Sequence, residues 1–389
     1  MSGRLPTDFG TFRFDQLAML VNDRAVNPAV SGVERYVGLE HLDAESLRIR
    51  RWGDVTDVES TKLRFQPGDI IFGKRRVYQR KLAVADFEGI CSAHAMVLRA
   101  RADVVLPEFL PFFMQSDTFM NRALEISVGS LSPTINWKTL AAEEFALPPI
   151  EEQRRLVVVL GAARMSAERA SSLVACLNVL LRSATNATAE RGIRANQLVA
   201  LDDLVLPERP ICYGILMPGA GFEGGVPVVK VKDYPNGYVN VDDLLLTDPR
   251  IDEEYRRSRL RAGDLLVSIR GTIGRLAQVP DSLDGANITQ DTARLSIRPE
   301  VNTDYVRAML ESSYVKRQIA QLTTGLAVQG INIGELRRVQ VPMVDKALQS
   351  ELVEEVVALR AAIRAAVRRE GESAGLLRSL RDRLVGSES

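Results

Sequence analysis

The sequence is poor in the residues on which most metal sites and many active sites depend. Its 389 residues include two histidines and three cysteines. The cysteines, Cys91, Cys176 and Cys212, lie far apart, so we expect neither a paired-cysteine metal site nor a disulfide framework. No nucleophile elbow, zinc-protease motif, Walker sequence or glycine-rich cofactor loop occurs. These absences argue against an enzyme.

The sequence also lacks a long apolar run and an excess of either charge. The apolar run at residues 156–160 is far too short to cross a bilayer, and residues 1–14 show no basic segment followed by an apolar one. We therefore expect a soluble, cytoplasmic chain with no membrane partner. Lysine plus arginine equals aspartate plus glutamate at 50 each, so a nucleic-acid surface would have to be a local basic patch.

A long helix is predicted to start at the motif Leu-Pro-Pro-Ile-Glu-Glu-Gln-Arg-Arg of residues 147–155. Proline is tolerated in the first helical turn, and Glu151 and Glu152 suit the positive end of the helix dipole. Behind them the apolar positions alternate in steps of four and three, which is the pattern of a coiled-coil seam. The positions of this first ladder are Leu156, Leu160, Ala163, Ala167, Ala170, Val174, Leu177 and Leu181.

A second ladder of the same kind occupies residues 352–384. Both ladders have large residues at their ends and small ones in the middle, which predicts antiparallel pairing. Glu370, with Gly371 and Gly375 beside it, is a local flaw and a candidate break in the helix. The alternative is that each helix packs separately on its own domain. The positions of the second ladder are Leu352, Val356, Leu359, Ile363, Ala366, Glu370, Ser373, Leu377, Leu380 and Leu384.

The two ladders each follow a similar stretch of sequence, with corresponding residues about 195 positions apart. A period of this length indicates a duplicated domain rather than a solenoid. The second copy has Asp291 near the place of His94, and no histidine, so we interpret His41 and His94 as structural. The matching pairs are Gly68-Asp69 with Gly263-Asp264, residues 70–72 with 265–267, Phe109 with Tyr305, Gly129 with Gly325, Ile135-Asn136 with Ile331-Asn332, Leu140 with Leu336, and Pro148 with Pro342.

Each copy combines short strand patterns with helical ones. Strands are predicted at 36–39, 68–73 and 95–98, and a helix at 107–124. We predict an α/β (α+β) protein with two tandem mixed domains, each followed by a long helix, the two helices pairing as an antiparallel coiled coil. The predicted boundaries are 1–147 for the first domain, 148–184 for the central helix, 185–196 for a linker, 197–343 for the second domain and 344–386 for the last helix.

Basic segments follow corresponding strands in the two copies. Residues 73–81 contain five cations, and between Lys62 and Arg101 cations outnumber anions by nine to three. Such segments suit phosphate contacts, although a solvated charged face is the alternative for either segment taken alone. The candidate DNA-binding residues are Lys74, Arg75, Arg76, Tyr78, Arg80, Lys81 and Ser130 in the first copy, and Arg270, Thr272 and Arg275 in the second.

With these residues the chain resembles the specificity subunit (HsdS) of Type I restriction–modification enzymes, over nearly its whole length. The second copy departs from the pattern at its junction, Val341-Pro342-Met343, which lacks the second proline and the Glu-Glu-Gln. The segments that carry the resemblance are 67–74, 89–92, 129–135 and 147–154 in the first copy, and 263–268 and 271–274 in the second.

The resemblance implies two target-recognition domains, each reading one half of a bipartite sequence in double-stranded DNA. It implies that the helices set the gap between the halves and dock methyltransferase subunits, with restriction subunits as a further partner. It also implies no catalytic site and no cofactor on this chain. S-adenosylmethionine for adenine methylation, and ATP and Mg for cleavage, would belong to the partner subunits.

Two other functions remain open. One is a protein-binding adaptor whose paired domains use the coiled coil as a scaffold, and a lack of affinity for duplex DNA would favour it. The other is a self-sufficient DNA-modifying enzyme, against which the missing cofactor motif argues.

Overall fold

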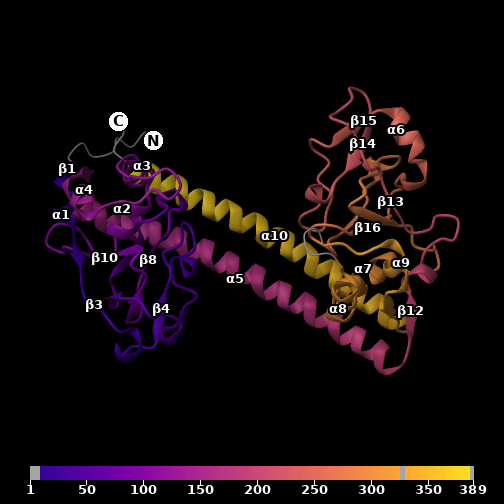
Figure 1. Cartoon of the computed structure of the whole chain (residues 1–389), viewed down its shortest axis with the longest axis horizontal. Helices are drawn as coiled ribbons and strands as arrows, with labels where there is room; N and C mark the ends of the chain where they lie inside the picture. Colours follow the sequence, from indigo (N-terminus) through magenta and orange to yellow (C-terminus); the bar gives the residue numbers. More distant parts are fainter. Residues whose placement is uncertain (1–8, 325–328, 386–389) are drawn as a thin grey trace. The chain divides into compact units, whose positions relative to one another are not determined.

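The computed structural model of the chain describes residues 9–324 and 329–385, without the side chains of 383–385. It divides into two units (Figure 1). The first comprises Met1–Ser172 and Val367–Ser389, and the second comprises Leu173–Ala366. Each unit contains one mixed α/β domain and one part of each long helix. None of the described helices combines the length and apolarity needed to cross a membrane.

The first domain is built on a four-stranded antiparallel sheet whose inner strand β7 is buried along its whole length. The apolar sequence Ile-Ile-Phe-Gly of this strand suits a position covered on both faces. The predicted strands at 68–73 and 95–98 correspond to β7 and β10, which confirms both. The strands, in their order across the sheet, are β2 (Ala18–Val21), β10 (Ala95–Ala100), β7 (Ile70–Gly73) and β8 (Leu82–Val84).

A second sheet in this domain has five short strands, of which β4 and β9 pair in parallel. A separate antiparallel pair joins β1 (Gly10–Arg13) to β11 (Glu144–Leu147), so the two ends of the domain meet immediately before the long helix. The strands of the five-stranded sheet, in order, are β3 (Arg24–Ala25), β6 (Lys62–Phe65), β9 (Gly89–Cys91), β4 (Arg35–Val37) and β5 (Gly53–Asp54).

In its described part the first domain has four α-helices, and the predicted helix at 107–124 is split in two. Ser116 has an extended backbone, and its hydroxyl accepts a hydrogen bond from the Phe119 amide, so it ends one helix and caps the next. Both helices bury phenylalanines in the domain core. The helices are α1 (Phe14–Leu17), α2 (Leu110–Gln115), α3 (Asp117–Glu125) and α4 (Trp137–Ala142).

The second domain repeats this topology, as the sequence predicts. Its four-stranded sheet has the order β13, β19, β16, β17, which corresponds strand for strand to that of the first domain. The smaller three-stranded sheet again contains one parallel pair, β14 with β18. Gly325, the predicted counterpart of Gly129, lies outside the described residues. The strands are β12 (Leu198–Ala200), β13 (Cys212–Tyr213), β14 (Val226–Val229), β15 (Leu245–Thr247), β16 (Leu265–Ser268), β17 (Leu276–Gln278), β18 (Asn287–Ile288), β19 (Thr292–Leu295) and β20 (Gln340–Pro342).

Three helices of the second domain, α7, α8 and α9, match α2, α3 and α4 of the first. Ser312 separates two of them and caps the second through the Val315 amide, as Ser116 does in the first domain. The hydroxyl of the buried Tyr305 donates to the Pro342 carbonyl and ties this helical layer to the edge pair of strands. The helices are α6 (Pro249–Glu254), α7 (Thr303–Glu311), α8 (Ser313–Leu322) and α9 (Ile333–Arg338).

The long helices are α5 (Ile150–Arg194) and α10 (Lys346–Val385). The predicted linker at 185–196 is therefore mostly helical. Its threonines and asparagine have low helix propensity, but the Thr185 hydroxyl donates to the Leu181 carbonyl, and the Asn186 side chain bonds Ser313. Ala189 is buried in the core of the second domain. Helix α10 likewise continues through Glu370, without the break considered from the sequence.

The predicted seam is confirmed within each unit. The start of α5 accompanies the end of α10 in the first unit, and the end of α5 accompanies the start of α10 in the second, so the helices run antiparallel. In the first unit Ser166 and Ser373 approach to 3.3 Å between hydroxyl oxygens. Leu384 has no described side chain. The other seam leucines, all buried or partly buried, are Leu156, Leu160, Leu177, Leu181, Leu352, Leu359, Leu377 and Leu380.

The large seam residues also belong to the domain cores. Leu156 and Leu160 share one apolar cluster with Leu377, Leu380 and the phenylalanines of the first domain. Leu181 and Leu352 belong to the corresponding cluster of the second domain. The alternative of two independent amphipathic helices is thus replaced by one arrangement, in which each domain packs on both helices of its unit.

This packing predicts that Leu160→Glu lowers the free energy of unfolding of the first unit. Leu160 is 0% exposed, and losing a buried leucine alone costs about 2–5 kcal/mol, to which the buried charge adds. The control is Val158→Glu, on the same helix at 69% exposure, which should change stability by less than about 0.5 kcal/mol. Urea unfolding followed by circular dichroism measures both, and equal midpoints would contradict the packing.

Candidate nucleic-acid interface

The basic segment of the first domain lies against the Gly-Ser loop that precedes α4. The Lys74 carbonyl accepts from the Ile135 amide at 2.9 Å, and the Arg76 amide donates to the Pro133 carbonyl at 2.7 Å. Arg75 and Thr134 form an isolated β-bridge. The structure therefore brings Lys74, Arg75 and Arg76 close to the loop that contains Ser130, although more than fifty residues separate them in the sequence.

Two left-handed residues shape this segment. Arg76 and Arg80 have φ angles of 59° and 51°, a conformation that few residues with side chains adopt. Between them residues Val77–Gln79 form a short 3₁₀ turn with Val77 buried beneath it. Tyr78 is 54% exposed, so it is available to a ligand rather than packed in the core.

Arg80 and Lys81 are bonded within the domain. The Arg80 guanidinium donates to the Asp117 carboxylate at 2.6 Å and to the Gln115 carbonyl at 2.7 Å, and lies 3.6 Å from Glu45. The Lys81 ammonium donates to the Leu39 carbonyl at 2.6 Å. These contacts hold the segment to neighbouring elements and use the charge of Arg80 inside the protein.

Lys74, Arg75 and Arg76 differ, because no carboxylate among the described residues pairs with them. Arg75 Nη1 lies 3.2 Å from His94 Nε2, and Arg76 Nε donates to the Ser132 hydroxyl at 3.3 Å. Desolvation, followed by the charges of Arg75, Lys74 and Lys62, lowers the pKa of His94. The neutral imidazole is thus favoured, and it can accept from Arg75 without cancelling its charge.

The second domain places Arg270 in the same way. The Ile331 amide donates to the Ile269 carbonyl at 3.0 Å, and Arg270 forms a β-bridge with Gly330. Arg270 Nη1 donates to the Gln290 side-chain oxygen at 2.9 Å. In each copy an arginine that follows the strand β7 or β16 is therefore bonded to a neutral side chain. That side chain, His94 or Gln290, lies just before the neighbouring strand β10 or β19.

The other candidates of the second domain lie in a tight turn after Arg270. Gly271 and Gly274 have positive φ angles of 70° and 78°. The Ser268 hydroxyl donates to the Thr272 carbonyl and accepts from the Arg275 amide at 2.8 Å, which closes the turn. Thr272 is exposed and Arg275 is partly buried, so the turn presents a hydroxyl next to Arg270.

The repeated Gly-Asp motif has a structural role in both copies. The Asp69 carboxylate accepts from the Gln66 amide at 2.9 Å and from Arg99 at 2.7 and 3.0 Å. Asp264 accepts from the Arg261 amide at 2.8 Å and from Arg209 at 2.9 Å. Each buried carboxylate thereby fixes the turn that leads into the inner strand.

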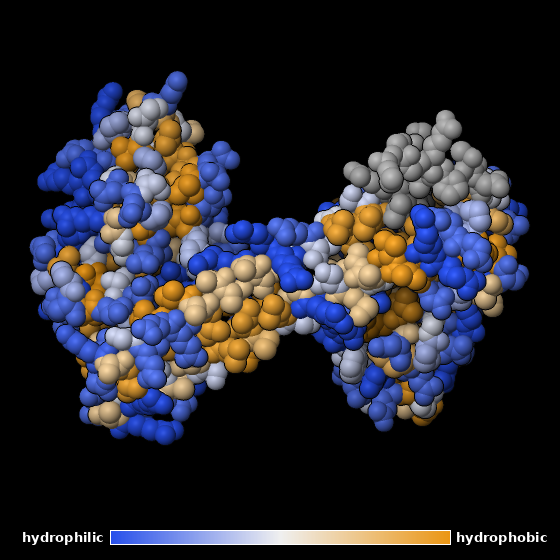
Figure 2. Space-filling view, turned by 180° about the vertical axis from the view of Figure 1, so that it is seen from behind, coloured by the Kyte–Doolittle hydropathy of each residue, from blue (hydrophilic) through white to orange (hydrophobic). Residues whose placement is uncertain are grey.

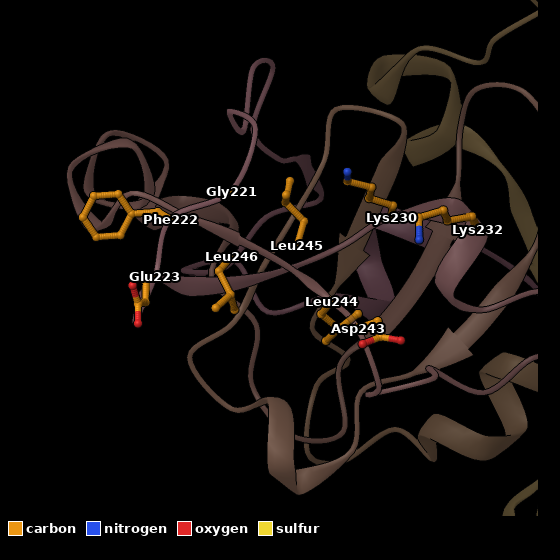
Figure 3. A pocket seen from close by; sticks show the side chains of 9 residues that line it. All are labelled: Gly221, Phe222, Glu223, Lys230, Lys232, Asp243, Leu244, Leu245 and Leu246. Carbon is orange, nitrogen blue, oxygen red and sulfur yellow. The ribbon is translucent and has the colours of Figure 1, made fainter.

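A cavity of mixed charge on the smaller sheet of the second domain was not predicted from the sequence. This cavity of about 440 Å³ is lined by Lys230 and Lys232, which Figure 3 shows on one side, and by Phe222 and Glu223 on the other. These residues are scattered and of mixed charge, so no local excess of cations marks them in the sequence. The presence of Glu223 and Asp243 in the lining makes this cavity less suited to phosphate than the segments above.

Comparison with known proteins connects this architecture to one family. No family model matches the chain. The chain is 30% identical over 162 residues to the specificity subunit of the Type I restriction enzyme EcoBI of Escherichia coli, an alignment that covers 41% of this chain and 34% of that protein. The chain spans about a third of the length of the curated relatives it matches.

Solved structures share the fold over nearly the whole chain. The S subunit of a Type I restriction–modification system from M. genitalium aligns with a TM-score of 0.61 at 13% identity and covers 99% of both chains. A chain from a study of complex assembly and conformational transition in a type I R-M system aligns with a TM-score of 0.55 at 18% identity over 100% of both. This chain is therefore similar to Type I specificity subunits in sequence over part of its length and in fold over nearly all of it. The resemblance found in the sequence motifs is thereby confirmed.

The chain also exposes apolar side chains on α5. In the first unit these include Val158, Val159 and Met165, and in the second unit Leu173, Val179 and Leu180. They lie away from the seam positions of the same helix. Figure 2 shows hydrophobic residues gathered on the exposed surface of the long helices. Contiguous exposed apolar surface of this kind marks interaction sites.

Arg76 and Arg80, which share a left-handed backbone conformation, test whether Arg80 supports the fold while Arg76 does not. Arg80→Ala should lower the free energy of unfolding by about 1–2 kcal/mol, because it removes bonds to Asp117 and Gln115 that are partly screened by solvent. Arg76→Ala, at the same backbone conformation but with one long bond to Ser132, should change it by less than about 0.5 kcal/mol. Equal urea midpoints for the two variants would contradict this division.

Proposed function

We propose that the chain is the non-catalytic DNA sequence-specificity subunit of a Type I restriction–modification complex. Each mixed domain would serve as a target-recognition domain for one half of a bipartite sequence in double-stranded DNA. The observation that carries the proposal is the pair Arg75 and Arg270, which occupy corresponding places in the two copies and have neutral side-chain partners among the described residues. Repetition of this arrangement argues against a merely solvated charged face.

The contacts of these arginines suit the phosphate backbone. A guanidinium held by His94 or Gln290 keeps its charge and is oriented before the ligand arrives, which lowers the entropic cost of binding. Phosphate contacts position a protein on DNA without reading its sequence. We assign Lys74, Arg76 and Ser130 to the DNA-facing surface of the first domain, with Tyr78 at its exposed edge, and Thr272 and Arg275 to the corresponding surface of the second. The internal bonds of Arg80 and Lys81 make them supports of this surface, in place of the direct contact expected from the sequence.

The helices would dock the partner subunits. The exposed apolar residues of α5 occur in both units, which supports one methyltransferase subunit for each. Restriction subunits are a further proposed partner. S-adenosylmethionine, ATP and Mg would be bound by those partners, and this chain would bind no cofactor. Such a complex would act on DNA in the cytoplasm. The adaptor function shares this docking surface, but it provides no role for Arg75 and Arg270.

The salt dependence of DNA binding tests the proposal. Arg75→Ala and Arg270→Ala should each flatten the plot of log affinity against log salt by about one unit, because each removes one phosphate contact. The double variant should flatten it by about two. Affinity is measured by fluorescence anisotropy at several salt concentrations, using the full chain with its methyltransferase partner.

The control for this experiment is Arg209→Lys, which retains a cation beside Asp264 inside the second domain and should leave the slope unchanged. A slope that stays constant in the double variant while the methylated sequence relaxes would make both arginines base readers. Absence of any affinity for duplex DNA, with or without the partner, would favour the adaptor function.

The docking surface is tested by Val158→Glu and Val179→Glu. Each adds a charge to exposed apolar surface, so each should weaken methyltransferase binding at least about tenfold while leaving the fold intact. Ala175→Glu is the control, since it adds the same charge to an exposed position that does not belong to the apolar set. Pull-down and calorimetry with the methyltransferase measure the effect. Binding equal to that of the control would exclude this face of α5.

A further inference from the structure

The first domain contains a cavity of about 740 Å³, within the range of small-molecule sites. Strands β2, β6 and β10, the start of the basic segment and the start of α4 line it. Part of its wall is apolar, formed by Leu20, Met96, Ile135 and Trp137. We call it the Trp137 cavity. It lies within one domain, so its shape depends on the packing of that domain alone.

The charges on its wall are all of one sign. Arg24, Lys62 and Lys74 line the cavity, and no aspartate or glutamate is among the lining residues. Lys62 is only 6% exposed, and its ammonium donates to the Ser60 carbonyl at 2.8 Å and to the Ser60 hydroxyl at 2.6 Å, both neutral acceptors. In the described part of the chain no carboxylate pairs with any of the three. An anion in the cavity would supply the counter-charge that the protein does not.

The remaining wall suits an aromatic ring with polar edges. Trp137 packs edge-on against Phe14 at 6.0 Å between ring centroids, which holds the indole in place. Asn22 and Asn136 add amide groups, and Thr61 and Thr134 add hydroxyls. Indole rings stack on nucleobases, and amides can pair with the polar edges of bases. An aromatic base and a phosphate are the two parts of a nucleotide.

The second domain does not repeat this wall. The place of Lys74, one residue before Arg75, is taken before Arg270 by Ile269, which is buried in the core of that domain. The place of Trp137, directly after Asn136, is taken after Asn332 by Ile333. The cation and the indole are therefore not requirements of the duplicated fold, and their presence in the first domain calls for a separate role.

We propose that the Trp137 cavity binds one nucleotide unit, with the base against Trp137 and the apolar wall and the phosphate near Lys74, Lys62 and Arg24. The unit is either a free nucleotide or an unstacked nucleotide of a DNA strand. The second case rests on the proposed function and deepens it, because the first domain would then hold a displaced base as well as the backbone.

Tryptophan fluorescence provides a direct readout. The chain has two tryptophans, Trp52 and Trp137, so Trp52→Phe leaves Trp137 as the single reporter. In this background deoxynucleoside monophosphates and a short single-stranded oligodeoxynucleotide are titrated separately. A saturable change in Trp137 fluorescence is expected. Calorimetry on the chain with both tryptophans measures the same binding without the reporter.

Two further variants locate the site. Lys74→Ala should weaken binding at least about tenfold, since it removes a charge-assisted bond to phosphate. Lys138→Ala, an exposed lysine beside Trp137 that is not among the lining residues, should bind as the background does. Ala93→Phe, at an exposed position on the cavity wall, should block binding by filling the space.

The outcomes distinguish a free nucleotide from a DNA strand as the ligand, and they distinguish failure of the cavity inference from failure of the proposed function. A response to the oligonucleotide alone assigns the site to a DNA strand, and a response to monophosphates assigns it to free nucleotides. No binding of either, or equal weakening by Lys74→Ala and Lys138→Ala, overturns the inference. Duplex binding by the same variants with the methyltransferase is measured in parallel. If duplex binding persists in Ala93→Phe and neither ligand binds the background, the cavity inference fails while the proposed function stands.

Discussion

The structure depends on leucines whose burial serves two purposes at once, the pairing of the long helices and the completion of the domain cores. Leu156, Leu160, Leu377 and Leu380 form the helix seam of the first unit and at the same time complete its domain core. Leu181 and Leu352 do the same in the second unit. Because the same side chains serve both purposes, neither domain has a complete apolar core without the two helices. Folding of each domain and pairing of its helices are therefore one cooperative event.

Regular spacing made the helices and the repeat predictable. The four-and-three ladders identified both long helices, and the collinear pairs such as Gly68-Asp69 and Gly263-Asp264 identified the duplication. The end of α5 was not predictable in this way, because Thr185 and Asn186 are poor helix formers that are held by Leu181 and Ser313. The break at Ser116 was missed for the opposite reason, since the phenylalanine spacing continues across it while its hydroxyl caps a new helix.

The candidate interface was predictable only as far as neighbouring cations are visible in a sequence. The run of cations from Lys74 to Lys81 is visible in the sequence. The internal pairing of Arg80 is not, because Arg80 contacts Asp117 and Glu45 only in the folded domain. Lys62 and Arg24, on separate strands, join Lys74 only in the folded domain. What distinguishes these side chains is the partner each one has, and partners distant in the chain leave no local pattern.

The buried Gly-Asp turns fix the sheets independently of the exposed segments that follow the strands. Asp69 holds the entrance of β7 through Arg99 and the Gln66 amide, and Asp264 holds that of β16 through Arg209 and the Arg261 amide. Neither set of bonds uses a residue of the exposed segment beyond the strand. Mutation can therefore rewrite that segment without shifting the register of the sheet beneath it. A duplicated fold built in this way can acquire a new preference in one copy while the other copy keeps its own.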